Sequence, residues 1–122
     1  MSDKKIKIAI CGLGTFAQKR LLPALAKTDM FNLIAVAGNS LENVQLNSTV
    51  KKYAKLTDLL NGIELDVVHV ATPNSLHYMQ ALECLRQSTD VICEKPLATV
   101  STHCDEMISL AKQHGRHLLV GH

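Results

Sequence analysis

Short apolar runs of strand length alternate with segments of helical period along nearly the whole chain. Such alternation is typical of βαβ units, whose crossover connections place parallel strands in one sheet and helices on its faces. The pattern predicts an α/β fold, a doubly wound parallel-sheet Rossmann domain of about six strands in the order 3-2-1-4-5-6. The predicted strands are Lys7–Cys11, Phe31–Ala37, Val50–Ala54 (the weakest pattern), Asp66–Ala71, Asp90–Cys93 and His117–Gly121.

Two helices are predicted by apolar residues spaced i, i+3, i+4 and i+7, which fall on one helix face. The two faces consist of Tyr78, Ala81, Leu82 and Leu85, and of Cys104, Met107, Ile108 and Ala111. A further helix is expected over residues 15–27. Pro23 should kink or divide it, because proline lacks an N–H and its ring clashes with the preceding turn.

The last helix carries signals at both of its ends. Thr102 and Asp105 resemble a capping box, which predicts the start of the helix there. Gly115 is expected to stop the helix, since glycine adopts the left-handed conformation that follows many helix ends.

The length of 122 residues suits one domain, and no linker or composition shift divides residues 1–122. A hydrophobic content of 47% and a charged content of 20% are typical of soluble globular proteins. The net charge of +2 is too small to indicate nucleic-acid binding.

The charge is unevenly distributed along the chain. Residues 1–61 carry nine basic and four acidic residues (+5), and residues 62–122 carry four basic and seven acidic residues (−3). A mixed solvated surface and an anion-binding first half both remain open.

The four cysteines form no CxxC pair, and glycines interrupt the apolar start of the chain, unlike a secretory leader. We therefore expect a cytoplasmic protein with reduced thiols, most of them buried, at Cys11, Cys84, Cys93 and Cys104. No apolar segment has the length of a membrane span. The scattered histidines match no zinc spacing, so no metal site is expected.

The segment CGLGTFA follows the first predicted strand and opens into a helix. Gly12, Gly14 and Ala17 give it the pattern G-x-G-x-x-A. In a dinucleotide-binding loop the first glycine permits the tight turn and the second lets a pyrophosphate approach the backbone. The third small residue allows close helix packing, and the helix N-terminus attracts the anion. The pattern therefore predicts dinucleotide binding, with a purely structural glycine turn as the alternative.

The second strand ends in AGNS, where the fingerprint expects an acidic residue that binds the adenosine ribose. A carboxylate there repels a 2′-phosphate, whereas Asn39 and Ser40 are neutral hydrogen-bonding residues that tolerate one. The sequence therefore favours NADP(H) among the NAD(P) cofactors, although no Arg follows to pair with the phosphate.

The segment ATPNSLH ends the fourth strand, which should lie beside the first strand at the switch point of the sheet. The expected wall of the nucleotide site is formed by Ala71, Thr72, Pro73 and Asn74. Either Asn74 or Ser75 is expected to cap the next helix. His77 in its first turn is either a ligand contact or a solvated surface residue.

Glu94, Lys95 and Pro96 follow the fifth strand, which should bring them to the same crevice. Pro96 biases Lys95 toward an extended backbone. A lysine at this place can donate to a carbonyl oxygen and stabilise the negative charge that develops on it in hydride transfer. Glu94 would orient the lysine or line the pocket. A surface ion pair beside a turn proline is the alternative.

The segments IAICGLGTFA, VATPNSLHYMQAL and VICEKPLA, in this order and spacing, resemble the N-terminal domain of the glucose-fructose oxidoreductase, inositol dehydrogenase and MocA-like family. The resemblance covers essentially the whole chain. It implies that NAD(P) binds through Gly12, Gly14 and the backbone around Thr15 and Phe16. It also implies that the nicotinamide half lies near Thr72, Pro73, Asn74 and His77, and that Lys95 contributes to the active site beside Glu94.

The chain departs from this family in two ways. Residues 85–91 replace the glycine-containing turn that many members have before strand five, which affects only local loop geometry. Members also continue into a second α/β domain that supplies substrate contacts, and that domain is absent from the 122 residues.

The resemblance implies the cofactor-binding half of an NAD(P)-dependent oxidoreductase that acts on a sugar, polyol or related hydroxyl or carbonyl compound. Alone, it is expected to turn over weakly or not at all, and to accept a small-molecule substrate only where a second domain or partner completes the site. A noncatalytic NAD(P)-binding module is the alternative. No nucleic-acid or membrane partner is expected, and homo-oligomerisation stays open.

Overall fold

The computed structural model describes residues 5–15, 17–39, 41, 44–94 and 101–121. Within these ranges six parallel strands form one sheet in the order β3-β2-β1-β4-β5-β6. The strands are β1 (Ile6–Cys11), β2 (Phe31–Ala37), β3 (Lys51–Tyr53), β4 (Val67–Val70), β5 (Asp90–Glu94) and β6 (Leu118–Gly121). The predicted fold class and strand order are confirmed, including the weak third strand.

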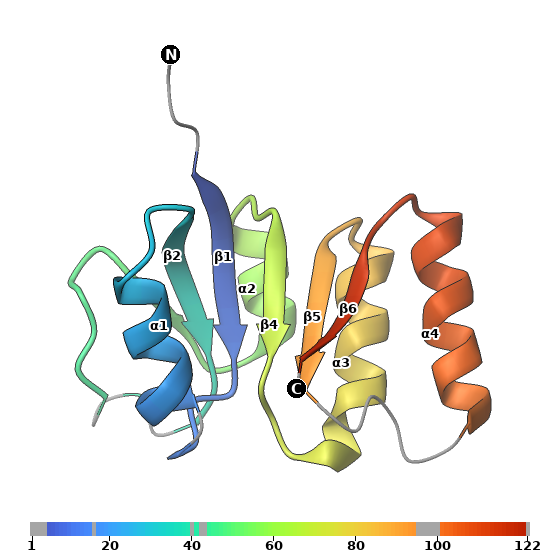
Figure 1. Cartoon of the computed structure of the whole chain (residues 1–122), viewed down its shortest axis with the longest axis horizontal. Coiled ribbons are helices and arrows are strands. Elements are labelled where there is room, and N and C mark those ends of the chain that lie inside the picture. The colour runs from blue at the N-terminus through green and yellow to red at the C-terminus, as the bar shows by residue number, and fades with distance from the viewer. Residues whose placement is uncertain (1–4, 16, 40, 42–43, 95–100, 122) are drawn as a thin grey trace.

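Helices lie on both faces of the sheet, but unevenly (Figure 1). On one face, the π-helical turn η1 (Ala17–Leu21) and α1 (Leu22–Ala26) pack around Ile10 and Val36 of β1 and β2. On the other face, a larger apolar cluster joins the sheet to α2 (Leu56–Gly62), α3 (Asn74–Arg86) and α4 (Ser101–Gln113). In the described part of the chain, no helix covers β5 and β6 on the α1 side.

Pro23 divides the first helical segment, as predicted. The segment begins with η1 and becomes α1 only at Leu22, with Pro23 in the first turn of α1. Proline has no N–H to donate to the carbonyl of Lys19, and a wider π-helical turn is one of the ways in which a helix accommodates such an interruption.

Helix α2 was not anticipated from the sequence. It buries Leu56 and Leu59 against the larger cluster. Seven residues make only about two turns, too few for a clear apolar period.

The expected start of α4 was wrong. Thr102 is the second residue of the helix, which begins at Ser101, so it cannot act as the N-cap. The expected end is confirmed. Gly115 has φ of 64°, its N–H bonds to the carbonyl of Lys112 (3.2 Å), and the N–H of Arg116 bonds to the carbonyl of Ala111 (2.8 Å).

Helix α3 ends with the same hydrogen-bond pattern, but on a serine. Ser88 has φ of 57°, its N–H bonds to the carbonyl of Leu85 (2.9 Å), and the N–H of Thr89 bonds to the carbonyl of Cys84 (3.0 Å). The glycine missing from the turn before β5 is therefore replaced by a residue held in the left-handed conformation, which disfavours residues with a Cβ.

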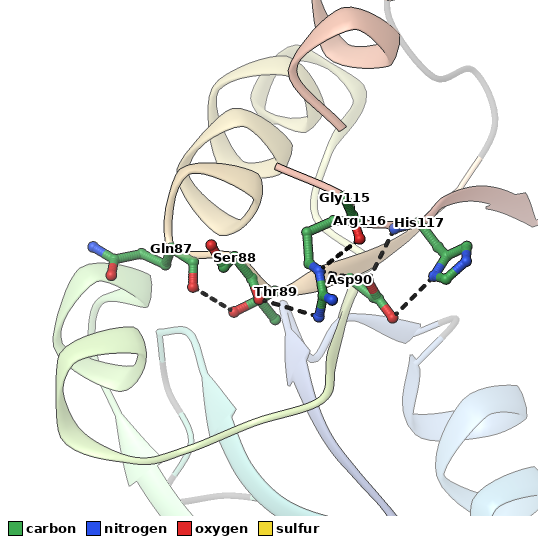
Figure 2. A network of polar contacts seen from close by, with 7 residues as sticks. All are labelled: Gln87, Ser88, Thr89, Asp90, Gly115, Arg116 and His117. Atoms are coloured by element: carbon green, nitrogen blue, oxygen red, sulfur yellow. Dashed lines mark hydrogen bonds and ion pairs between the residues drawn. The ribbon is translucent and has the colours of Figure 1, made fainter. Parts of the chain in front are cut away.

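Asp90 connects the turns before β5 and β6 (Figure 2). Its Oδ1 accepts a hydrogen bond from the backbone N–H of His117 (2.9 Å) and lies 3.7 Å from Nε of Arg116. Nη1 of Arg116 reaches the carbonyl oxygen of Ser88 (3.5 Å). One carboxylate thus aligns the starts of two neighbouring strands, with support from an arginine that spans both turns.

Ser88→Gly is expected to raise the free energy of unfolding by about 1 kcal/mol, because glycine adopts the left-handed conformation without the clash of a Cβ. The carbonyl that accepts from Arg116 is retained. Urea denaturation measures the change. Gly115→Ser is the matched control and should destabilise the protein by a similar amount. A Ser88→Gly protein no more stable than the original would contradict the expectation.

Candidate functional site

A cleft of about 560 Å³ opens at the carboxyl ends of β1, β2 and β4. It is lined by seven of the predicted site residues, Gly12, Gly14, Thr15, Asn39, Ala71, Thr72 and Pro73. The lining residues that the sequence analysis did not single out include Gly38, Ala54, Leu56, Leu76 and Gln80. Four distant segments thus meet where the chains leave the sheet to opposite sides.

A second hollow of about 730 Å³ lies at the amino ends of the strands, beside Lys7, Asp66 and Ser88. Although it is larger, we place the candidate site in the first cleft. Ligands of open α/β sheets bind outside the carboxyl ends of the strands, and the predicted residues gather there.

Gly12 forms the floor of the cleft. Its φ is 94° and its N–H donates to the carbonyl of Ala37 (2.8 Å), which turns the chain away from β1. A Cβ at this position would lie 2.7 Å from Cγ2 and 3.0 Å from the backbone N of Thr72. Glycine is therefore required both by the backbone conformation and by the close approach of β4.

Gly14 faces open space. Among the described residues, no atom outside its immediate neighbours lies within 4 Å of the position that its Cβ would occupy. The loop continues directly into the first helical turn, where the N–H of Gln18 bonds to the carbonyl of Gly14 (3.1 Å). A ligand in the cleft can therefore reach the backbone of Gly14 without displacing any side chain that the structure describes.

Ala17 does not line the cleft. Its side chain is buried, with an exposed fraction of 1%, in the cluster that joins η1 to β1 and β2. This position matches the packing role expected for the third small residue of the glycine pattern.

His77 is not the solvated surface residue that was one of its two alternatives. It is 1% exposed, so it is not a solvated surface residue, and it is not among the residues that line the cleft. Its Nε2–H donates to the carbonyl of Thr72 (2.7 Å), and the hydroxyl of Thr72 donates to Oε1 of Gln80. His77 and Gln80 of α3 thus hold the carbonyl and the hydroxyl of Thr72 on the cleft wall.

The expected cap of α3 was wrong. The helix begins at Asn74 and its N-cap position is Pro73, which makes no side-chain capping bond. Asn74 and Ser75 are therefore the first and second residues of the helix and neither occupies the N-cap position.

Glu94 turns toward β4. Its carboxylate Oε2 lies 2.5 Å from Nε2 of His69, with side chains that are 20% and 9% exposed. The sequence analysis did not identify His69, because a histidine within the apolar strand VVHV is predicted to be a buried packing residue. The one available signal was a polar residue in an otherwise apolar buried strand.

Cys11 lies at the base of the cleft as a neutral thiol. Burial, followed by the charge of Glu83, raises its pKa from 9.0 to about 12. Cys84 and Cys93 are also buried and free, with their pKa values raised mainly by burial. These three cysteines are packing residues, as expected, and Cys104 is half-buried.

Three predicted site residues lie outside the described residues, namely Phe16, Ser40 and Lys95. Within the described ranges, no group of three His, Cys, Asp or Glu side chains could hold a metal ion, and no helix is long and apolar enough to cross a membrane. No charged side chain is among the described residues that line the cleft.

Gly12→Ala is expected to lower the free energy of unfolding by about 2 kcal/mol or more, because the new Cβ meets the backbone of Thr72 in a left-handed conformation. Gly14→Ala is the matched control and should change it by less than about 0.5 kcal/mol, since the position is open. Urea denaturation compares the two. Equal effects would contradict the structural distinction between these glycines.

Known proteins resemble the chain over most of its length. The chain is 32% identical over 114 residues to scyllo-inositol 2-dehydrogenase (NADP(+)) IolU of Bacillus subtilis, covering 90% of this chain and 34% of that protein. It is 30% identical over 120 residues to D-glucoside 3-dehydrogenase of Escherichia coli, covering 95% and 34%. The chain therefore spans about one third of the length of these relatives.

Solved structures agree with the fold. The WlbA dehydrogenase from Chromobacterium violaceum, in complex with NADH and UDP-GlcNAcA, matches with a TM-score of 0.85 and 30% identity over 99% of this chain and 36% of that one. D-galactose-1-dehydrogenase from Rhizobium etli matches with a TM-score of 0.87 and 26% identity over 97% and 37%. Residues 6–122 also match the model of the oxidoreductase family with an NAD-binding Rossmann fold. The chain thus belongs to the Gfo/Idh/MocA oxidoreductase family, and it forms the NAD-binding Rossmann fold of that family.

Proposed function

We propose that the cleft binds NADP(H) through the backbone of the glycine loop. The observation that carries this proposal is the contrast between Gly12, packed against β4, and Gly14, open to the cleft. A pyrophosphate can approach the amide groups of Gly14, Thr15 and Phe16, while Ala17 holds the following turn against the sheet. The cleft volume of about 560 Å³ is typical of a cofactor site.

The two halves of the dinucleotide would lie on opposite sides of this loop. Asn39 and Ser40 would contact the adenosine ribose, since they follow β2. The wall at the end of β4 would contact the nicotinamide half through Ala71, Thr72, Pro73 and Asn74. His77 would act from behind that wall, because its bond fixes the carbonyl of Thr72. The bond of Glu94 to His69 would set the direction in which the chain leaves β5.

The preference for NADP(H) is supported by the absence of a carboxylate from the described cleft lining. Gly38 stands directly after β2, near the place where NAD-binding domains carry the acidic residue that holds the ribose 2′-hydroxyl. One relative is described as NADP(+)-dependent. A neutral site accommodates a 2′-phosphate without charge repulsion.

For the whole protein we propose hydride transfer between this cofactor and a hydroxyl or carbonyl carbon of a sugar, polyol or related compound. The relatives described above act on scyllo-inositol, a D-glucoside and D-galactose according to their names. The cofactor supplies or accepts the hydride at nicotinamide C4. Lys95 would hydrogen-bond the reacting oxygen and stabilise the charge that develops on it.

Titration of the chain with NADPH and NADH, followed by nucleotide fluorescence, tests the cofactor proposal. NADPH should bind at least as tightly as NADH. Gly38→Asp should weaken NADPH binding about tenfold or more, because the carboxylate repels the 2′-phosphate, and should strengthen NADH binding. The site tolerates a side chain, since a Cβ would meet Leu41 Cδ2 at 3.6 Å and the backbone of Gly12 and Leu13 at 3.8 Å, which are ordinary van der Waals contacts. Gly38→Ser is the neutral control. A strong NADH preference of the unaltered chain would refute the proposal.

Lys95→Ala tests the proposed chemistry. Any reduction of NADP(+) by the chain with scyllo-inositol, D-glucose or D-galactose should fall by about 100-fold or more, and by more than NADPH affinity falls. Turnover retained in Lys95→Ala would exclude the catalytic role. Firm cofactor binding without turnover of any sugar or polyol, in a protein whose site a second domain or partner completes, would favour the alternative of a noncatalytic NAD(P)-binding module.

A further inference from the structure

The end of β3 forms part of the cleft rim. The N–H of Gly38 donates to the carbonyl of Tyr53 (3.0 Å), which joins the chain after β2 to the end of β3. Ala54 and Leu56 both line the cleft. Lys55 lies between them, so its backbone is part of the same rim although its side chain is exposed to solvent.

Lys55 and Asn39 follow the ends of two paired strands. Ala37 and Tyr53 form the last pair between β2 and β3, and Asn39 and Lys55 each lie two residues beyond it. Neighbouring strands are about 4.8 Å apart, so the segments that follow β2 and β3 start from adjacent positions. Lys55 keeps an extended backbone, with φ of −125° and ψ of 143°. Both residues therefore lie in segments that leave adjacent strands at the cleft edge.

The ammonium group of Lys55 forms no ion pair with the described residues. The ion pairs among the described residues are formed by His69 with Glu94 and by Asp90 with Arg116 and His117, and none includes Lys55. Its flexible four-carbon stem lets the ammonium reach an anion bound at the neighbouring strand end.

Lys55 is also a poor residue for its local structure. It occupies the N-cap of α2 and makes no side-chain capping bond, whereas Ser, Thr, Asp and Asn are preferred there. A positive charge at a helix start is unfavourable as well. Residues that conflict with local stability are concentrated at functional sites.

We propose that Lys55 is a specificity-determining residue that supplies the cation for the 2′-phosphate of NADP(H). This inference rests on the proposed NADP(H) site. A cation supplied by Lys55 would explain why the segment after β2 needs no basic residue to pair with the 2′-phosphate. The cation comes from the end of the neighbouring strand, while Asn39 supplies a neutral hydrogen-bonding group. A lysine binds phosphate as a point charge, so it discriminates NADPH from NADH without contacting the rest of the dinucleotide.

The test compares NADPH and NADH affinities of the unaltered chain with those of Lys55→Ser, Lys55→Arg and Lys52→Ala. Lys55→Ser should weaken NADPH binding about tenfold and change NADH binding by less than about twofold. Its free energy of unfolding should stay equal or rise, since serine is a better N-cap. Lys55→Arg should keep the NADPH preference. Lys52, on the same edge strand but opposite Val36, is the matched control and should leave both affinities unchanged.

Competition by adenosine 2′,5′-bisphosphate and adenosine 5′-monophosphate adds a readout limited to the adenosine half. Only the bisphosphate should lose affinity in Lys55→Ser. Equal weakening of NADPH and NADH, or no weakening of either, would refute the role of Lys55 while leaving the nucleotide site intact. An unaltered chain that binds neither nucleotide would refute the proposed function itself, and this inference with it.

Discussion

The close approach of Gly12 to Thr72 is the contact on which the cleft depends. With the first glycine turned at φ of 94° and hydrogen-bonded to Ala37, the ends of β1, β2 and β4 meet at one residue that has no side chain. Any Cβ at this place would push β4 away from β1. The floor of the cleft is therefore backbone, and backbone amides are groups that can bind an anion without adding a charge of their own.

Polar groups near the cleft are arranged so that the described lining stays neutral. The carboxylate of Glu94 bonds to His69 behind the wall, burial keeps Cys11 protonated, and His77 donates to a backbone carbonyl. Discrimination between charged ligands is then left to residues at the rim, where water still reaches the side chains. Gly38 and Lys55 lie at that rim, in the segments that follow the paired strands β2 and β3.

Much of the fold was predictable, because its signals are local or periodic. Strand-length apolar runs, the division of the first helix at Pro23 and the stop at Gly115 each depend on neighbouring residues in the chain. Helix α2 was missed since seven residues give too short a period. The caps expected at Thr102 and at Asn74 or Ser75 were wrong, because these residues lie inside their helices, and helix ends are the least sharply defined part of a helix.

The sequence by itself determined that a strand, a glycine turn and a helix succeed one another, and hence that a parallel sheet has its switch point after β1. Only the tertiary structure decided which side chains meet there. His77 is buried and bonds to the carbonyl of Thr72, Glu94 bonds to a histidine of another strand, and Lys55 follows the strand that pairs with β2. The reason is physical. Backbone conformation depends on local sterics, whereas contacts between side chains depend on the register of strands that are distant in the chain.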